Sequence, residues 1–321
     1  MLLVTGATGY VGAALLALLR ERGLSVRVTV RSPDRARALP PDVPWVLADL
    51  ADPESVRRAA EGCAAVFHLA ATVGRSAEQT RRLNVLGTAT VLDAARAAGV
   101  RRIVHTSSAA AIVDGTGLVD EAAPATTALG DPYSTSKAES ERLVLAAAGD
   151  GLETVVVSPV SIYGPSPAGP LSYNQLFAAA ARGEVSEVVD ARVGWVLASD
   201  VALGHLLAYE RGESGRRYVL CGETATFGAV LHRYAELVGS PHRVRALAAG
   251  SSLGPDSSTF ASRSEVYGKL GPVRVLDSAA RALGFTPTGL ADGLAATASW
   301  MSRLDRSGAS GASGAGPSAP T

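Results

Sequence analysis

Short apolar runs alternate with amphipathic stretches through the first 160 residues. The runs are rich in β-branched residues, as buried strands are. The predicted strands are Leu2–Thr5, Ser25–Val30, Trp45–Ala48, Ala65–Leu69, Ile103–Thr106 and Thr154–Val157. Helical spacing of apolar positions occupies the segments near 10–22, 53–61, 80–98 and 132–148. This alternation predicts an α/β fold built on a doubly wound parallel sheet, with ligands at the carboxyl ends of the strands.

The alternation loosens after Pro159. Prolines and glycines between 164 and 170 predict a loop, and helical spacing returns near 171–182, 200–211, 226–238, 277–283 and 289–304. We therefore predict a core over 1–160 and a smaller, helix-rich C-terminal lobe over 161–304 that binds most of the substrate, with some elements returning to the core. Residues 305–321 are rich in Gly, Ser and Ala and carry no large apolar side chain, so a disordered tail is expected there.

Composition narrows the class of protein. The chain has 321 residues, 47% hydrophobic and 19% charged, and a net charge of zero, so a large core is expected and a nucleic-acid partner is not. Two cysteines, Cys63 and Cys221, exclude a disulfide framework and a cysteine-based zinc site. We expect no metal. With no leader and no apolar run of membrane length at the start, we expect a cytoplasmic protein without a membrane partner.

A glycine-rich segment, Thr5–Gly12, follows the first strand and opens the first helix. Gly6 permits a tight turn, Gly9 lets the backbone approach a pyrophosphate, and Gly12 allows close packing of the helix on the strand. The helix N-terminus then offers free amides to the phosphates. The segment predicts the dinucleotide site of a Rossmann fold, with contacts from Gly6, Thr8, Gly9, Tyr10, Val11 and Gly12.

The residue that ends the second strand distinguishes the two nicotinamide cofactors. An acid there binds the ribose hydroxyls of NAD, whereas a cation suits the 2′-phosphate of NADP. This chain has Arg31, followed by Arg35. A guanidinium donates paired hydrogen bonds to a phosphate, so the sequence favours NADP(H), with NAD(H) as the alternative.

Tyr133 and Lys137 lie four residues apart at the start of a predicted helix and project from one face. A neighbouring ammonium lowers the pKa of a phenol, which then transfers a proton at neutral pH. The pair is informative because Lys137 and Lys269 are the only lysines in the chain. A hydroxyl from Ser107 or Ser108, directly after the fifth predicted strand, could stabilise charge on a substrate oxygen.

These features together resemble the extended short-chain dehydrogenase/reductase family. Its motifs recur in order over about residues 1–304: TGATGYVG, Ala48-Asp49-Leu50, His68-Leu69-Ala70-Ala71, NVLGT, HTSSA, PYSTSK, SPVSIYGP and ALGFTP. The segments VTVRSP and EGCAAVFHLAA resemble the corresponding segments of the dihydroflavonol-4-reductase-like branch of the family. The resemblance implies catalytic Ser108, Tyr133 and Lys137, the last two also touching the cofactor. It implies further cofactor contacts from Asp49, Leu50, Leu69, Ala70, Ala71, Pro159, Val160 and Ile162, and structural roles for His68 and Asn84.

The resemblance leaves the reaction open. Many nucleotide-sugar members carry Arg-Pro where this chain has Ser158-Pro159, and no Thr-Asp-Glu run replaces HTSSA, as sugar dehydratases would have. The lobe offers the apolar Leu171, Tyr173, Leu176, Phe177 and Trp195, with Arg182 and Arg192 as its cations over 165–200. We expect an NADP(H)-dependent oxidoreductase that reduces a ketone or aldehyde of a small, fairly apolar molecule, or oxidises the matching alcohol. A nucleotide-sugar epimerase and a non-catalytic dinucleotide sensor are the alternatives, and a homodimer is an open option.

Overall fold

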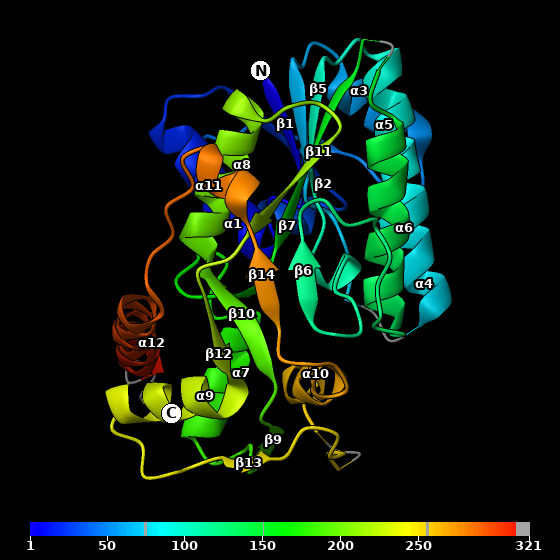
Figure 1. Cartoon of the computed structure of the whole chain (residues 1–321). Coiled ribbons are helices and arrows are strands. Elements are labelled where there is room, and N and C mark those ends of the chain that lie inside the picture. The colour runs from blue at the N-terminus through cyan, green and yellow to red at the C-terminus, as the bar shows by residue number, and fades with distance from the viewer. Residues whose placement is uncertain (74–75, 150, 255–256, 313–321) are drawn as a thin grey trace, which may run out of the picture.

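A seven-stranded parallel sheet forms the centre of the molecule (Figure 1). The computed structural model describes residues 1–73, 76–149, 151–254 and 257–312. The sheet has the order β11-β7-β5-β4-β1-β2-β3. Its strands are β1 (Leu2–Thr5), β2 (Val26–Val30), β3 (Trp45–Leu47), β4 (Ala65–His68), β5 (Arg102–Thr106), β7 (Glu153–Pro159) and β11 (Arg216–Leu220). The predicted doubly wound sheet is confirmed, and its strand order reverses between β1 and β4, where such folds bind their ligands.

Helices cover both faces of this sheet (Figure 1). One layer contains α1 (Tyr10–Glu21) and α8 (Ala198–Arg211), and the other contains α3 (Pro53–Ala60), α5 (Gly87–Ala97) and α6 (Pro132–Ala146). Successive strand residues point to opposite faces, so Val4 packs under the first layer and Leu3 under the second. The short α2 (Pro33–Ala36) follows β2. Both α8 and β11 belong to this core although they come after residue 160.

The helical segment predicted over 80–98 has an interruption. It consists of α4 (Ala77–Arg81), a π-helical turn η1 (Arg82–Leu86) and α5. Asn84 on this turn is buried, and its side chain exchanges hydrogen bonds of 2.8 and 3.0 Å with the backbone of Thr72 and donates one of 3.0 Å to Ser136 Oγ. The π turn therefore joins the loop after β4 to helix α6.

The C-terminal lobe contains small sheets as well as helices. Its sheets pair β12 (Glu223–Thr226), β10 (Arg192–Leu197) and β8 (Ser161–Tyr163), then β13 (Arg245–Leu247) with β9 (Glu187–Val189), and β14 (Arg274–Leu276) with β6 (Leu118–Asp120). Its helices include α7 (Tyr173–Ala181), α9 (Phe227–Leu237), α10 (Thr259–Gly268) and α11 (Ser278–Ala282), and a 3₁₀ turn η2 (Ala109–Ala111) follows β5. The sequence predicted neither these strands nor α10, because most of the strands are too short to show an alternating pattern.

The aromatic residues of the lobe form its own core. Phe177 and Trp195 are fully buried, and the Trp195 ring lies 5.3 Å from that of Phe227. The prediction that Leu176, Phe177 and Trp195 line a substrate site is therefore wrong, because α7 and β10 turn these side chains inward. Leu171 is instead exposed, and Tyr173 is buried in this core, where its ring contacts Trp195, Phe227 and Phe260.

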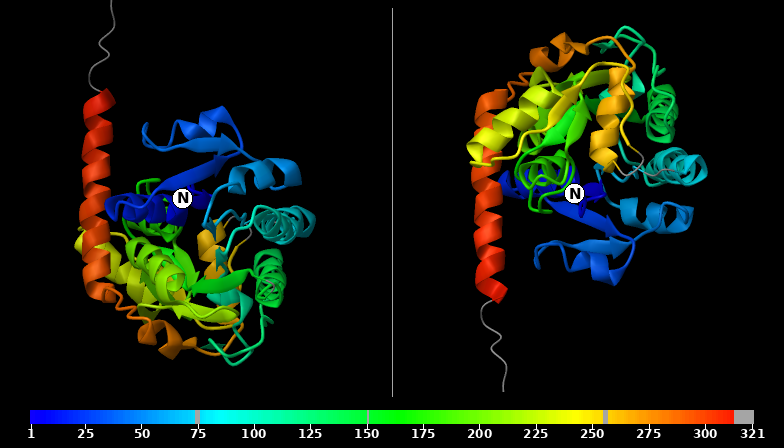
Figure 2. Two further views of the ribbon diagram at one scale, coloured as in Figure 1. Left: turned by 90° about the horizontal axis from the view of Figure 1, so that it is seen from above. Right: turned by 90° about the horizontal axis from the view of Figure 1, so that it is seen from below.

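The last helix, α12 (Leu290–Ala312), runs along one edge of the molecule, on the side opposite α4–α6 (Figure 2). The sequence predicted that this helix ends at 304 and that a disordered tail begins at 305, whereas the helix continues to Ala312. Buried Leu294, Ala298 and Met301 anchor the part of this helix that contacts α9 and β10. Residues 313–321 lie outside the described residues. None of the described helices is both long and apolar enough to cross a membrane.

Candidate active site

The glycine turn after β1 has no room for side chains at two positions. Gly6 has φ +75°, and a Cβ there would lie 2.7 Å from the backbone nitrogen of Ala70. A Cβ on Gly12 would lie 2.1 Å from the carbonyl oxygen of Gly6. Gly12 thus lets helix α1 pack against the turn itself, where the sequence predicted packing on the strand. The turn keeps the backbone bare where a dinucleotide's phosphates would approach.

The N-terminus of α1 is open to an anion. Gly9 is the N-cap, no side chain caps the helix, and no acidic residue stands in its first turn. First-turn amides without partners carry the positive end of the helix dipole. A pyrophosphate is the kind of group that such a terminus binds.

A cavity of about 460 Å³ lies beside this turn. Nine predicted cofactor contacts line it, namely Gly6, Thr8, Gly9, Arg31, Asp49, Leu50, Leu69, Ala70 and Ala71. Residues that the sequence analysis did not assign also line it, namely Thr29, Val30, Arg35, Ala48, Thr72, Gln79, Leu83 and Leu171. Their positions at the ends of β2 and β3 could have indicated Thr29, Val30 and Ala48, whereas Leu171 comes from a distant loop and has no local signal. The residues present fit a dinucleotide.

Other predicted contacts are not in the lining of this cavity: Tyr10, Val11, Gly12, Tyr133, Lys137, Pro159, Val160 and Ile162. Tyr10 has a structural role, because its hydroxyl donates a 2.6 Å hydrogen bond to the carbonyl oxygen of Gly164 and accepts one of 2.8 Å from Asn174 Nδ2. It thereby joins α1 to the loop between β8 and α7. The roles of the other residues in cofactor binding stay predictions.

Arg31 and Arg35 supply the cationic end of the cavity. Both side chains are exposed, and within the described part of the chain neither takes part in an ion pair. The neighbouring Arg37 differs, since it pairs with Asp34 at 3.3 Å. Two guanidinium groups are therefore accessible to an anionic group bound at the end of β2.

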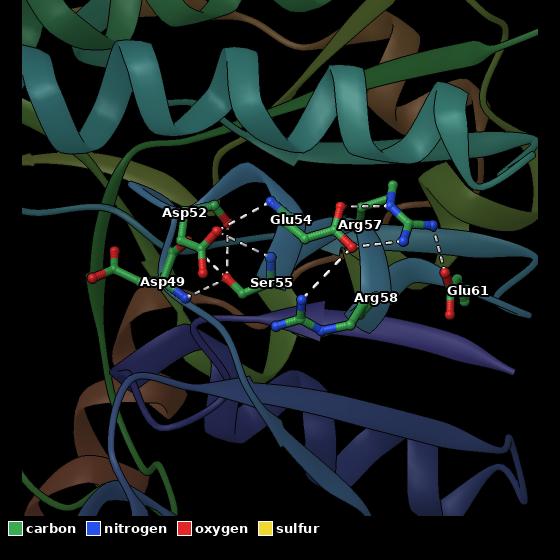
Figure 3. A network of polar contacts seen from close by, with 7 residues as sticks. All are labelled: Asp49, Asp52, Glu54, Ser55, Arg57, Arg58 and Glu61. Carbon is green, nitrogen blue, oxygen red and sulfur yellow. Dashed lines mark hydrogen bonds and ion pairs between the residues drawn. The ribbon is translucent and has the colours of Figure 1, made fainter.

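The loop after β3 is fixed by the start of α3 (Figure 3). The backbone nitrogen of Asp49 donates to Ser55 Oγ at 3.1 Å, and Asp49 Oδ1 accepts from the amide of Ala51 at 2.9 Å. Asp52 is the N-cap of α3 and accepts from the amides of Glu54 and Ser55 at 3.2 and 3.3 Å. These bonds hold Asp49 and Leu50 in place along the cavity.

Helix α6 places Tyr133 next to Ser108. Asp131 is the N-cap of this helix and accepts from the amide of Ser134 at 3.1 Å, with Pro132 in the first turn. Ser108 lies in the loop after β5, where its hydroxyl accepts from the amide of Ala110 at 3.2 Å and lies close enough to the phenol of Tyr133 to favour a lower pKa of that phenol. The neighbouring Ser107 is buried and donates instead to Glu141. The structure thus brings together the two hydroxyls that the sequence predicted.

Lys137 is buried beneath Tyr133 on the same helix. Burial lowers the pKa of Lys137 to about 8, and the nearby Glu141 opposes this shift. The predicted lowering of the Tyr133 pKa by Lys137 is not what the structure shows. Burial raises the pKa of Tyr133, and the nearby Ser108 hydroxyl and the charge of Arg263 act in the opposite direction. The Lys137 ammonium instead donates to the carbonyl oxygen of Thr106 at 2.7 Å.

A buried ion pair joins helix α6 to the large sheet. Glu141 on α6 pairs with Arg217 on β11, and the two side chains are 0% and 3% exposed. Burial raises the pKa of Glu141, while Arg217 and the Ser107 hydroxyl favour its charged form. Glu141 therefore links the catalytic helix, the loop that carries Ser108 and strand β11.

The buried side chain of His68 has a structural role. His68 shares hydrogen bonds with Thr5 Oγ1 at 2.8 Å and Thr88 Oγ1 at 3.1 Å. Burial lowers the pKa of His68 to about 3, so its ring is neutral. This agrees with the interpretation of His68 as a core residue.

The cation nearest to Tyr133 on the lobe side comes from α10. Arg263 forms an ion pair of 2.9 Å with Asp131, and its guanidinium lies 5.2 Å from the centre of the Tyr267 ring. By contrast, Arg182 pairs with Glu184 on the surface, and Arg192 donates to the carbonyl oxygen of Thr224. The sequence analysis considered those two arginines and missed Arg263, because only the tertiary fold brings α10 to α6.

Comparison with known proteins agrees with this geometry. The model of the NAD dependent epimerase/dehydratase family matches residues 2–221. The chain belongs to this family. It is 36% identical over 252 residues to a putative dihydroflavonol 4-reductase of Synechocystis, covering 74% of this chain and 72% of that protein. It is 34% identical over 254 residues to cinnamoyl-CoA reductase 1 of Petunia hybrida, covering 72% and 73%.

Among solved structures, MoeE5 in complex with UDP-glucuronic acid and NAD superposes with a TM-score of 0.76 at 28% identity, covering 94% of this chain and 99% of that one. The chain is thus an NAD(P)-dependent oxidoreductase of the extended short-chain dehydrogenase/reductase family, as the motifs predicted.

Proposed function

We propose that this enzyme reduces a ketone or aldehyde with NADPH, or oxidises the matching alcohol, using Tyr133 as the proton donor. The proximity of the Ser108 and Tyr133 hydroxyls carries the proposal, because it places two hydroxyls where one substrate oxygen could contact both. The putative dihydroflavonol 4-reductase and the cinnamoyl-CoA reductase among its relatives are named as reductases, which supports this direction.

Each side chain has a separate task in this proposal. The nicotinamide supplies the hydride when the cofactor is bound. Ser108 donates a hydrogen bond to the substrate oxygen, and Tyr133 transfers its proton to that oxygen as negative charge develops there. The Lys137 ammonium, anchored on Thr106, contributes positive charge beside the cofactor ribose.

The preference for NADP(H) over NAD(H) is part of the proposal. Arg31 and Arg35 line the cavity at the end of β2, where a 2′-phosphate would lie. Paired guanidinium donors are suited to a phosphate dianion.

Epimerisation of a nucleotide sugar is the second candidate. The structural likeness to MoeE5 with its bound UDP-glucuronic acid favours it. Against it, Arg182 and Arg192 are bonded on the lobe surface, although a diphosphate requires strong cationic donors. The buried, uncharged Ser158 also stands where many nucleotide-sugar members have arginine.

One assay separates the two reactions. Purified enzyme is incubated with NADPH and a panel of aromatic and aliphatic ketones, while NADPH consumption is followed at 340 nm, and in parallel with UDP-sugars in a coupled epimerase assay. The proposal expects stoichiometric loss of NADPH with at least one ketone. Epimerase turnover without net loss of NADPH, and no consumption with any ketone, would show that the second candidate is correct.

A further inference from the structure

Arg263 occupies a fixed position at the start of the catalytic helix. Its ion pair with Asp131, at 2.9 Å, ties α10 to the N-cap that stands two residues before Tyr133. The side chain of Arg263 is only 14% exposed. The guanidinium lies 5.2 Å from the centre of the ring of Tyr267, one helical turn further along α10. The guanidinium therefore lies on the lobe side of the phenol that is proposed to donate the proton.

The surroundings of this guanidinium are aromatic. Tyr173 and Phe260 lie ring to ring at 5.1 Å, and Tyr267 borders a narrow gap with Val160 and Ser161. The charge of Arg263 also acts on the phenols of Tyr133 and Tyr173, which places the three groups near one another. Aromatic rings supply contact area for a substrate but few hydrogen-bond donors. Arg263 is the strong donor in this wall.

The ion pair leaves donors of Arg263 available. A guanidinium has five N–H groups, and the bond to Asp131 uses Nη1. The Asp131 carboxylate beside the guanidinium repels a second anion, so the site suits an uncharged oxygen acceptor better than a free phosphate or carboxylate. A carbonyl or ester oxygen is such an acceptor.

We propose that Arg263 is a specificity-determining residue that donates a hydrogen bond to a second carbonyl oxygen of the substrate, a few atoms from the carbonyl reduced at Tyr133. This inference rests on the proposed reductase function, which supplies the first carbonyl. The substrate class is then a neutral dicarbonyl compound, such as a 3-oxo ester, carried on an aromatic or aliphatic body that packs against Tyr173, Phe260 and Tyr267.

Two probes of matched length test this assignment. Ethyl 3-oxo-3-phenylpropanoate contains the second carbonyl, and 1-phenylhexan-1-one replaces the ester with methylene groups. The wild type and Arg263→Met are compared by kcat/KM for both with NADPH. We expect Arg263→Met to lower kcat/KM for the 3-oxo ester by roughly 10- to 100-fold, the size of one hydrogen bond to a charged group. The value for the simple ketone changes by less than about 3-fold, because it makes no such bond.

Three variants separate substrate recognition from support of the fold. Arg263→Lys retains a charged donor and restores part of the preference for the ester. Asp131→Asn keeps an N-cap of α6 and removes the ion pair, so the preference for the ester survives. Arg182→Met removes an arginine of the same lobe that pairs with Glu184 on the surface. This variant leaves kcat/KM unchanged for both probes.

Each outcome is decisive. An equal loss with both probes, or no loss with either, overturns the role of Arg263 while leaving the reductase function standing. If neither probe is consumed, titration of the NADP⁺ complex with each probe replaces turnover. Tighter binding of the 3-oxo ester that disappears in Arg263→Met then supports Arg263 and rejects the reduction of these ketones. Absence of binding to either probe contradicts both proposals.

Discussion

The ammonium group of Lys137 donates a hydrogen bond of 2.7 Å to the backbone carbonyl oxygen of Thr106, at the last residue of β5. The lysine is 4% exposed, and its ammonium group is fixed at the carboxyl end of strand β5. Its position is thus set by two rigid elements, α6 and β5, before any ligand binds. A preorganised charge of this kind stabilises a bound group without the cost of ordering a flexible side chain.

Affinity for NADPH should fall as the pH rises through about 8. Burial lowers the pKa of Lys137 to about 8, so its ammonium loses its proton in this range and the attraction for the cofactor weakens. The other titratable groups facing Lys137 are Glu141 on α6, His68 on β4 and His105 on β5. Both histidines are neutral at these pH values, because burial lowers their pKa far below 6.5.

The check is the Kd of NADPH between pH 7 and 9.5, measured by fluorescence titration. Lys137→Met should bind NADPH weakly at every pH in this range and show no decline. A wild-type affinity that stays constant across pH 8 would mean that the Lys137 charge does not hold the cofactor.

Arg31→Ala should weaken NADPH binding by about 1.5–3 kcal/mol, the worth of a hydrogen bond to a charged group, and leave NADH binding unchanged. The reason is that only NADPH carries the 2′-phosphate that Arg31 is proposed to bind. Arg37→Ala is the matched control, since this neighbouring arginine is exposed and pairs with Asp34. A cofactor preference that is absent, or that survives Arg31→Ala, would remove Arg31 from the cofactor site.

Gly12→Ala should abolish cofactor binding and lower the melting temperature of the protein without cofactor. The added Cβ would lie 2.1 Å from the carbonyl oxygen of Gly6, which is backbone and must shift. Gly115→Ala is the control, because nothing lies within 4 Å of a Cβ at that position. Normal NADPH binding by Gly12→Ala, measured by titration, would contradict the packing described for the turn.

Arg217→Met should destabilise the fold by about 3–5 kcal/mol at pH 8, since it leaves Glu141 buried without its ionic partner. Burial raises the pKa of Glu141, and the raised value favours the folded variant only while the carboxyl is protonated. The free energy of unfolding of the variant therefore falls as the pH rises. Its difference from the wild type is smaller at pH 5 than at pH 8.

Urea unfolding at the two pH values measures this difference. Arg216→Met serves as the control, because that side chain is exposed and pairs only with Glu213, and its effect should stay within about 0.5 kcal/mol. A loss for Arg217→Met that is equal at both pH values would show that Glu141 is not the group left uncompensated.

The sequence predicted the elements whose residues carry a strong local pattern. Six strands of the large sheet were found. The central strands β1, β4, β5 and β7 are buried on both faces, which gives nearly continuous apolar runs, whereas β2 and β3 are less buried and were found from their apolar and β-branched residues. Strand β11 was missed because its sequence begins with Arg216 and Arg217, and the inward-facing Arg217 is tolerated only through its pairing with Glu141.

The residues of the candidate site also fall into those that a local sequence pattern predicts and those that it does not. The glycine turn, Tyr133, Lys137 and Ser108 lie in short motifs that can be identified from sequence. Arg263 and Leu171 join the site only through tertiary packing, and no periodicity indicates which distant segment will meet Asp131 or the cofactor cavity. For the same reason the sequence could not tell that Trp195 and Phe177 form the core of the lobe.

The most direct test of the central claim follows the hydride and the proton together. Wild-type enzyme and Tyr133→Phe are incubated with NADPH that carries deuterium at both C4 positions and with the best ketone from the screen, and the alcohol product is analysed by mass spectrometry. The account predicts one deuterium on the carbinol carbon with the wild type, and loss of turnover by at least about 100-fold in Tyr133→Phe, the lower range for general acid catalysis, with NADPH affinity and melting temperature preserved. Near-normal turnover by Tyr133→Phe, or a product without deuterium, would contradict it.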